Sequence, residues 1–114
     1  MIALSIEEAR TLLQFSKQKS IAKTAQAMNK ANSAIIYSLE SIEQKCGIKL
    51  FDRSGYRTLL LPTGERVLEG CKKLLNASDE LVVLCDELAQ GWESDLQIIV
   101  EGVVPLEHLI RGIK

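Results

Sequence analysis

Apolar positions recur every three or four residues in three short segments near the start of the chain, the spacing of helices that bury one face. Ser5 begins the first segment three residues before Glu8, a capping box that satisfies free N–H groups at a helix start. Ser20 caps the second, and the third is predicted from about Asn32 to Lys45. The pattern therefore predicts three consecutive helices, each with one buried face.

The stretch after the third helix has the pattern of a β-hairpin. Gly47 stands where a left-handed C-terminal helix cap is usual. Two strand-like runs follow, at residues 49–53 and 58–61, and the polar residues 54–57 between them indicate a turn. A helix pair followed by such a hairpin is the order of a winged helix-turn-helix, which places one helix in the DNA major groove.

A long helix is predicted from Pro62, where a missing N–H costs little, to about residue 90. Its apolar and small residues alternate steps of four and three, the spacing of a heptad seam. The seam consists of Val67, Cys71, Leu74, Ser78, Leu81, Cys85 and Leu88. A helix about 40 Å long cannot be covered by a domain of about sixty residues. The seam is therefore predicted to form a homodimer.

Beyond Gly91 the pattern changes again, because residues 96–101 are strand-like. A lone strand exposes an apolar edge, so this part is expected to begin a domain whose remainder is missing from the sequence. The predicted organisation is a winged helix-turn-helix domain over residues 1–61, a linker helix over 62–90 and the start of a truncated domain over 91–114. The expected fold class is mostly α.

Composition adds a charge asymmetry to this picture. The 114 residues are 46% apolar and 25% charged, values of an ordinary folded domain, and the formal net charge is −1. Residues 1–61 carry nine basic and five acidic residues, whereas residues 62–114 carry five basic and ten acidic ones. A basic first half suits contact with phosphates, and the acidic second half is expected to stand away from DNA.

Enzymatic and metal-dependent functions find little support in the sequence. The three cysteines lack metal-ligand spacing, and His108 is the single histidine. The sequence has no glycine-rich phosphate loop and no carboxylate pair placed for acid–base catalysis. We therefore expect no catalytic residue, no metal and no cofactor. No apolar run reaches the roughly 18 residues of a membrane span, and no secretion signal is visible at the start. The predicted location is cytoplasmic, without membrane contact.

Several residues in and after the helix pair form a recognisable set. They are Ser20, Ala25, Ser33, Ala34, Ile42, Glu43 and the block Gly-Ile-Lys-Leu-Phe-Asp-Arg over residues 47–53. With these, residues 4–90 resemble the DNA-binding head and linker helix of LysR-type transcriptional regulators. The resemblance implies a bacterial regulator of transcription that binds double-stranded DNA. It also implies a dimer or tetramer, and a small-molecule effector bound by the domain that residues 91–114 would begin.

Carried over position by position, the resemblance implies a DNA-contacting set on the third helix and on the wing. The set is Asn32, Ser33, Ile36 and Tyr37 on the helix, and Arg53, Tyr56 and Arg57 on the wing. Asparagine forms a bidentate pair with adenine, and serine contacts a base or a phosphate. Arginine at a wing suits a phosphate or a narrow minor groove.

The linker start departs from the family pattern at Leu61, where threonine is usual, and three positions in and before the recognition helix depart from it as well. Ala31 stands where the recognition helix usually has a capping serine, so Asn32 is an alternative cap. Ile36 and Tyr37 replace a usual serine and arginine, which exchanges two polar contacts for an apolar group and a phenol. A winged-helix module that has lost DNA binding and contacts a protein instead is therefore the alternative function.

In the family the two linker helices of a dimer pack antiparallel, and we expect the same here. If their two-fold axis lies near Ser78, Cys71 of one chain would lie opposite Cys85 of the other. The resulting prediction is a covalent dimer under mild oxidation.

Overall fold

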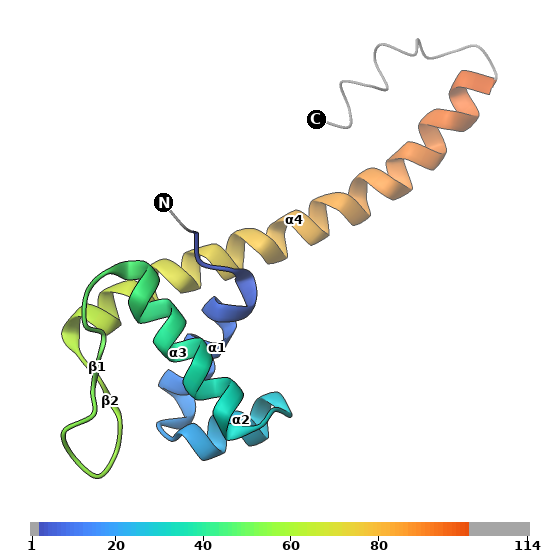
Figure 1. Ribbon diagram of the computed structural model, residues 1–114. Coiled ribbons are helices and arrows are strands. Elements are labelled where there is room, and N and C mark those ends of the chain that lie inside the picture. Colours follow the sequence, from blue (N-terminus) through green and yellow to red (C-terminus); the bar gives the residue numbers. More distant parts are fainter. Residues whose placement is uncertain (1–2, 101–114) are drawn as a thin grey trace. The chain divides into compact units, whose positions relative to one another are not determined.

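The computed structural model describes residues 3–100 of the chain, and their side chains as far as Gly91. The elements are α1 (Ile6–Gln18), α2 (Ile21–Met28), α3 (Asn32–Cys46), β1 (Phe51–Asp52), β2 (Leu59–Leu60) and α4 (Pro62–Val100) (Figure 1). The chain divides into two compact units, Met1–Asn76, which we call the head, and Ala77–Lys114. The fold is mostly α with one antiparallel hairpin, and the predicted fold class is confirmed.

Local sequence signals account for most helix ends in the head. The Ser5 hydroxyl accepts a hydrogen bond from the Glu8 amide at 3.0 Å, and the Glu8 carboxylate accepts one from the Ser5 amide at 2.8 Å. Ser20 accepts a hydrogen bond from the Lys23 amide at the start of α2. Gly47 ends α3 at φ 72°, a left-handed conformation that costs glycine little. The predicted caps are thus confirmed.

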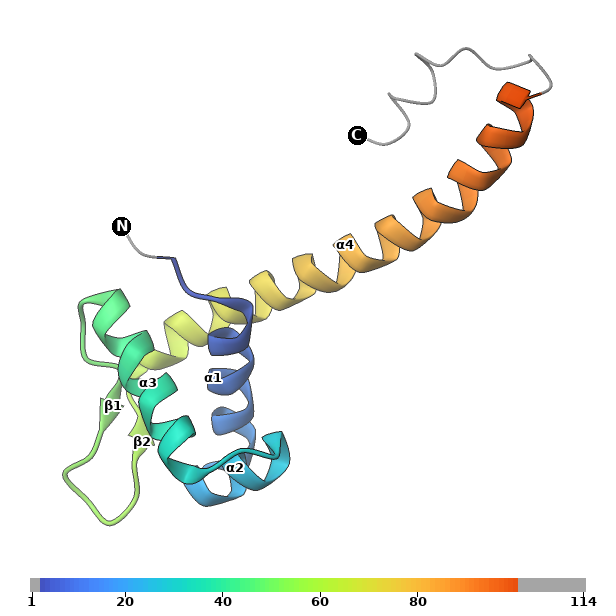
Figure 2. The same ribbon diagram turned by 45° about the vertical axis from the view of Figure 1, so that its right-hand side comes forward.

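The core of the head joins the three helices, the hairpin and the first turns of α4. Its buried apolar residues are Ala9, Leu12, Phe15, Ala25, Ile35, Leu39, Ile42, Leu50, Phe51, Leu68 and Cys71. Phe51 of β1 meets Phe15 of α1 edge to face, with ring centroids 5.7 Å apart. Figure 2 shows the hairpin beside α3, the arrangement of a winged helix-turn-helix.

The wing strands are shorter than the sequence indicates. Each has two residues, with Phe51 opposite Leu60 and Asp52 opposite Leu59. The Asp52 carboxylate accepts hydrogen bonds from the amide and the hydroxyl of Ser54, at 2.9 and 2.6 Å. This local turn ends the strand, because the Ser54 amide bonds to the Asp52 side chain and not to the opposite strand.

Helix α4 differs from the prediction at its C-terminal end. It continues through Gly91 to Val100, so the break at Gly91 and the strand over residues 96–100 were wrong. A glycine inside a helix costs only about 1 kcal/mol. A strand without a neighbour would leave its backbone groups unpaired, whereas a helix pairs them within the segment. Residues 101–114, which include the last residue of the predicted strand, lie outside the described residues.

The predicted seam on α4 divides between two environments. Val67 packs against the core of the head, and Cys71 is 2% exposed within it. Burial raises the pKa of the Cys71 thiol. The predicted pairing of Cys71 with Cys85 of a second chain was therefore wrong, because a thiol in the core presents no surface to a partner. Leu74, Leu81 and Cys85 are exposed, and they remain available as a seam.

None of the helices within residues 3–100 has the length and apolar composition needed to cross a membrane.

Candidate nucleic-acid interface

The first turn of α3 begins with the residue predicted to read a base. Asn32 is the first helical residue, and the N-cap is Ala31, which makes no side-chain hydrogen bond. The alternative in which Asn32 caps the helix is therefore wrong. A capping serine at position 31 would stabilise α3 by about 1 kcal/mol, and Ala31 does not provide this stabilisation. The Asn32 side chain is exposed, so its amide is available to bind a ligand.

The predicted contact residues lie on one outward face of α3. Asn32, Ser33, Ile36 and Tyr37 are all exposed, and Tyr37 is 74% exposed. Their spacing places them on adjacent turns of the helix. The opposite face carries Ile35, Leu39 and Ile42, which are buried in the head. The core thus determines which side of α3 faces outward.

The three predicted wing residues have different surroundings. Tyr56 and Arg57 are exposed in the loop between β1 and β2. Arg53 is turned back toward α3, where its Nη1 lies 3.0 Å from Oε1 of Glu43. The Arg53 guanidinium also lies 5.4 Å from the centre of the Phe51 ring, a cation–π contact.

A groove of about 530 Å³ brings α3 and the wing together with the start of α2. It is lined by Phe15, Gln18, Lys19, Ser20, Ile21, Ala22, Lys23, Asn32, Tyr56, Arg57 and Thr58. Lys19 and Lys23 were not among the predicted contacts. They flank the Ser20 cap at the N-terminus of α2, where free N–H groups favour anions. That position was the signal in the sequence that would have identified them.

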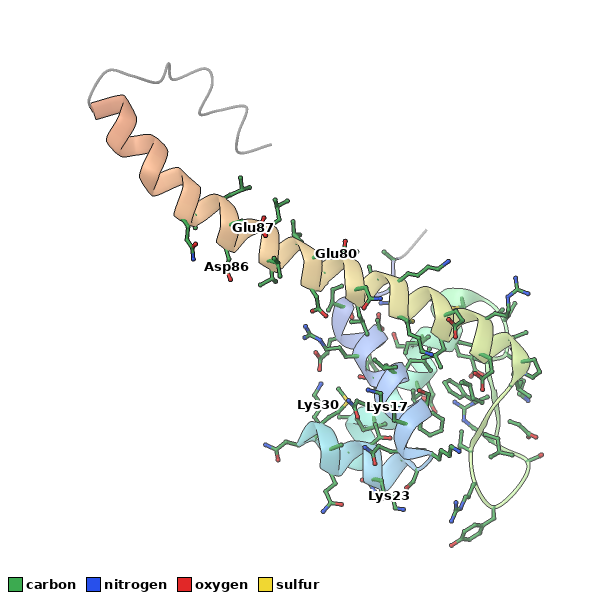
Figure 3. All side chains as sticks on the ribbon, turned by 180° about the vertical axis from the view of Figure 1, so that it is seen from behind. Lys17, Lys23, Lys30, Glu80, Asp86 and Glu87 are labelled. Carbon is green, nitrogen blue, oxygen red and sulfur yellow. The ribbon has the colours of Figure 1, made fainter. Side chains whose placement is uncertain are left out.

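Ion pairs decide which cations of the head are available to a ligand. Within the described residues, Arg10 and Lys30 pair with Glu7, Lys45 with Glu8 and Arg53 with Glu43. The other basic residues of positions 1–61 form none of these pairs, and they are Lys17, Lys19, Lys23, Lys49 and Arg57. In Figure 3 Lys23 extends from α2, whereas Glu80, Asp86 and Glu87 follow one another along α4.

Two carboxylates link elements of the head: Glu8 links α1 to α3, and Glu43 links α3 to the start of the hairpin. Burial alone would raise the pKa of Glu8, but hydrogen bonds from Lys45, the Ser5 amide and Ser41 outweigh it and lower the pKa to about 2. Burial likewise opposes the charge of Glu43, and hydrogen bonds from the Leu50 amide, Arg53 and the Phe51 amide still lower its pKa. Both groups are therefore charged at neutral pH and act within the fold.

No group of three or more histidine, cysteine or acidic side chains in the described part of the chain is placed to hold a metal ion.

The fold and the outward face of α3 define a winged helix-turn-helix protein. Residues 6–65 match the family described as bacterial regulatory helix-turn-helix protein, lysR family. The chain belongs to this family, which confirms the resemblance drawn from the sequence. It is 36% identical over 103 residues to the probable HTH-type transcriptional regulator YhaJ of Escherichia coli, an alignment covering 90% of this chain and 35% of that protein. The chain thus spans about a third of the length of this relative.

Solved structures of similar fold include two determined with DNA. Vibrio fischeri DarR in complex with DNA matches 78% of this chain and 30% of its own, with a TM-score of 0.73 and 20% identity. The BenM DNA-binding domain in complex with catB site 1 DNA matches 76% of this chain and 94% of its own, with a TM-score of 0.71 and 22% identity. At these identities the likeness establishes the fold.

Proposed function

We propose that this chain is the DNA-binding part of a transcriptional regulator, and that it binds duplex DNA sequence-specifically with α3 in the major groove. One observation carries the proposal. Asn32 of the recognition helix lines one groove with Arg57 of the wing and with Lys19 and Lys23. These three cations form no ion pair among the described residues. The DNA complexes of DarR and the BenM domain, which share the fold, support it.

Each exposed residue of the interface suits one kind of DNA contact. Asn32 would read an adenine through its amide, and Ser33 would contact a base or a phosphate. Ile36 would touch a thymine methyl, and Tyr37 would donate its hydroxyl to a phosphate. On the wing, Tyr56 and Arg57 would meet the neighbouring backbone or minor groove, as exposed polar groups at a loop tip.

Lys19 and Lys23 add phosphate contacts at the N-terminus of α2. They position the head on the duplex without reading its sequence.

The intact regulator would act as a dimer through α4, with a tetramer and a small-molecule effector as further possibilities that the family resemblance implies. Leu74, Leu81 and Cys85 are exposed seam positions, and Ser78 and Leu88 are half-buried. A regulator of bacterial transcription works in the cytoplasm, where its DNA is. No catalytic step forms part of the proposal.

Salt dependence tests the proposal directly. A fluorescent duplex selected from a random pool is titrated with the chain at several salt concentrations. If three to five phosphates are neutralised per head, log affinity falls with log salt at a slope of about −3 to −4.5. A flat response, or no binding at low salt, contradicts DNA binding and favours the protein-interaction alternative.

A matched pair of variants tests whether the phosphate contacts are made in the groove. Lys23→Gln removes a groove cation and should reduce the slope by about 0.9, whereas Lys17→Gln removes an unpaired cation outside the groove and should leave the slope unchanged. Equal effects of the two variants would mean that the head binds DNA through diffuse charge.

A further inference from the structure

Glu43 connects the recognition helix to the root of the wing. It lies in the C-terminal half of α3, and its side chain is 17% exposed. Oε2 accepts hydrogen bonds from the amides of Leu50 and Phe51, at 2.8 and 3.0 Å. Oε1 accepts a hydrogen bond from Nη1 of Arg53 at 3.0 Å. One carboxylate therefore holds three groups at the point where the chain enters the hairpin.

Arg53 is held from two sides. Its guanidinium bonds to Glu43 and lies over the ring of Phe51, 5.4 Å from the ring centre. Phe51 is fully buried and packs edge-on against Phe15 of α1. The position of Arg53 is therefore tied to both α3 and α1.

The hairpin has few other constraints of its own. Its strands are two residues each, and a two-stranded hairpin of that length is not independently stable. Arg57 lies in the loop beyond these strands, so its position depends on how the root is attached to α3. The Glu43 carboxylate offsets the guanidinium charge of Arg53, which weakens the attraction of Arg53 for a phosphate.

We propose that Glu43 and Arg53 are positioning residues, which fix the wing against α3 so that Arg57 meets the DNA backbone while α3 occupies the groove. The inference rests on the proposed function and deepens it. It replaces the expectation that Arg53 is itself a DNA contact. Glu43 and Arg57 share no hydrogen bond or ion pair among the described residues, so a coupling between them in DNA binding does not come from a direct bond.

A double-mutant cycle on the full chain measures this coupling. The wild type, Glu43→Gln, Arg57→Met and the double variant are titrated against the duplex selected above. Arg57→Met should weaken binding by about tenfold in the wild type. It should weaken binding by less than about threefold with Glu43→Gln, because an unfixed wing no longer brings Arg57 to the backbone. If Arg57→Met weakens binding by the same factor with and without Glu43→Gln, the proposal is overturned. Such additive effects are what a general loss of stability from Glu43→Gln would give.

The salt slope separates a positioning residue from a phosphate contact. Arg57→Met should reduce the slope by about 0.9, while Arg53→Met should lower affinity and leave the slope unchanged. Arg53→Lys keeps a charge for Glu43 and should recover part of the affinity. A reduced slope for Arg53→Met would overturn the proposal.

Two controls keep the outcomes distinct. Circular dichroism establishes that each variant is folded, and if Glu43→Gln is not, the cycle is run with Arg53→Met in its place. Absence of wild-type binding at low salt would overturn the proposed function itself. Binding with additive costs would overturn only the positioning role.

Discussion

Single acidic residues of the head act as connectors between helices. Glu7 on α1 bonds to Lys30 after α2, and Glu8 on α1 bonds to Ser41 and Lys45 of α3 at 2.7 and 2.8 Å. Such charge-assisted bonds are about twice as strong as neutral ones when they are shielded from water. They also neutralise cations near the surface, so the count of basic residues overstates the charge offered to DNA.

Glu8 should make stability depend on acid. Its folded pKa of about 2 lies below the ordinary 4.5, so its stabilisation is present above about pH 4.5 and is lost as pH falls toward 2. Urea unfolding between pH 6 and pH 2 should show Glu8→Gln about 2–3 kcal/mol less stable than wild type at the upper end. The two proteins should converge near pH 2.

Glu40→Gln is the matched control, because Glu40 is an exposed carboxylate on α3. Its unfolding free energy should follow the wild type across the range. A difference between Glu8→Gln and wild type that stays constant with pH would show that packing, and not charge, accounts for the role of Glu8.

At the scale of elements, the start of α4 is hydrogen-bonded to the two residues that precede β1. The Leu61 amide donates to the Leu50 carbonyl at 2.8 Å, and the Thr63 hydroxyl donates to the Lys49 carbonyl at 2.6 Å. Gly64, in the first turn of α4, is buried beside the Leu50 carbonyl and the Leu60 side chain. Close approach of two backbones at this point requires a residue without a side chain.

Gly64→Ala should therefore destabilise the head. The added Cβ would lie 2.6 Å from the Leu50 carbonyl oxygen and would also meet the Leu60 side chain. Backbone cannot move aside as a flexible side chain can, so we expect a loss of about 1–3 kcal/mol in thermal or urea unfolding.

Gly70→Ala is the internal control on the same helix. A Cβ there meets nothing within 4 Å, so alanine should stabilise α4 by about 0.5–1 kcal/mol. If both substitutions stabilise the protein, the approach of α4 to the Leu50 backbone is looser than the structure shows.

At the scale of the whole molecule, the unit that begins at Ala77 exposes apolar side chains between acidic ones. Leu81 and Val83 are 58% and 55% exposed, on different faces of α4. No lysine or arginine occurs between residues 74 and 110, so this part repels phosphates. Clustered exposed apolar side chains indicate an interaction surface, which supports the proposed dimer.

Leu81→Asn should weaken that dimer, and Val83→Asn, of similar exposure but off the seam, should leave it intact. A two-fold dimer carries each substitution twice, so losing two buried leucines costs at least about 3 kcal/mol, roughly hundredfold in the dimer Kd. Sedimentation equilibrium measures the Kd. A monomeric wild type at micromolar concentration would reject the dimer, and equal effects of both variants would reject the seam.

Features of the head that depend on a few neighbouring residues were predictable from the sequence. The Ser5–Glu8 capping box, the Ser20 cap and the Gly47 termination involve groups within one helical turn. The outward face of α3 was predictable too, because the helical period separates Ile35 and Leu39 from the exposed residues. Ser20 and Gly47 also belong to the set of residues that carried the family resemblance.

Tertiary structure decided what the linear pattern left open. Cys71 and Leu81 share one heptad seam in the sequence, yet Cys71 enters the core of the head while Leu81 is exposed. The positions of carboxylates on other elements determined which cations are without an ion pair. Arg53 bonds to Glu43, ten positions earlier, only because the chain folds back after Gly47. The physical reason is the same in each case: burial and ion pairing depend on groups that are distant in sequence, whereas helix caps and helical periodicity depend on adjacent ones.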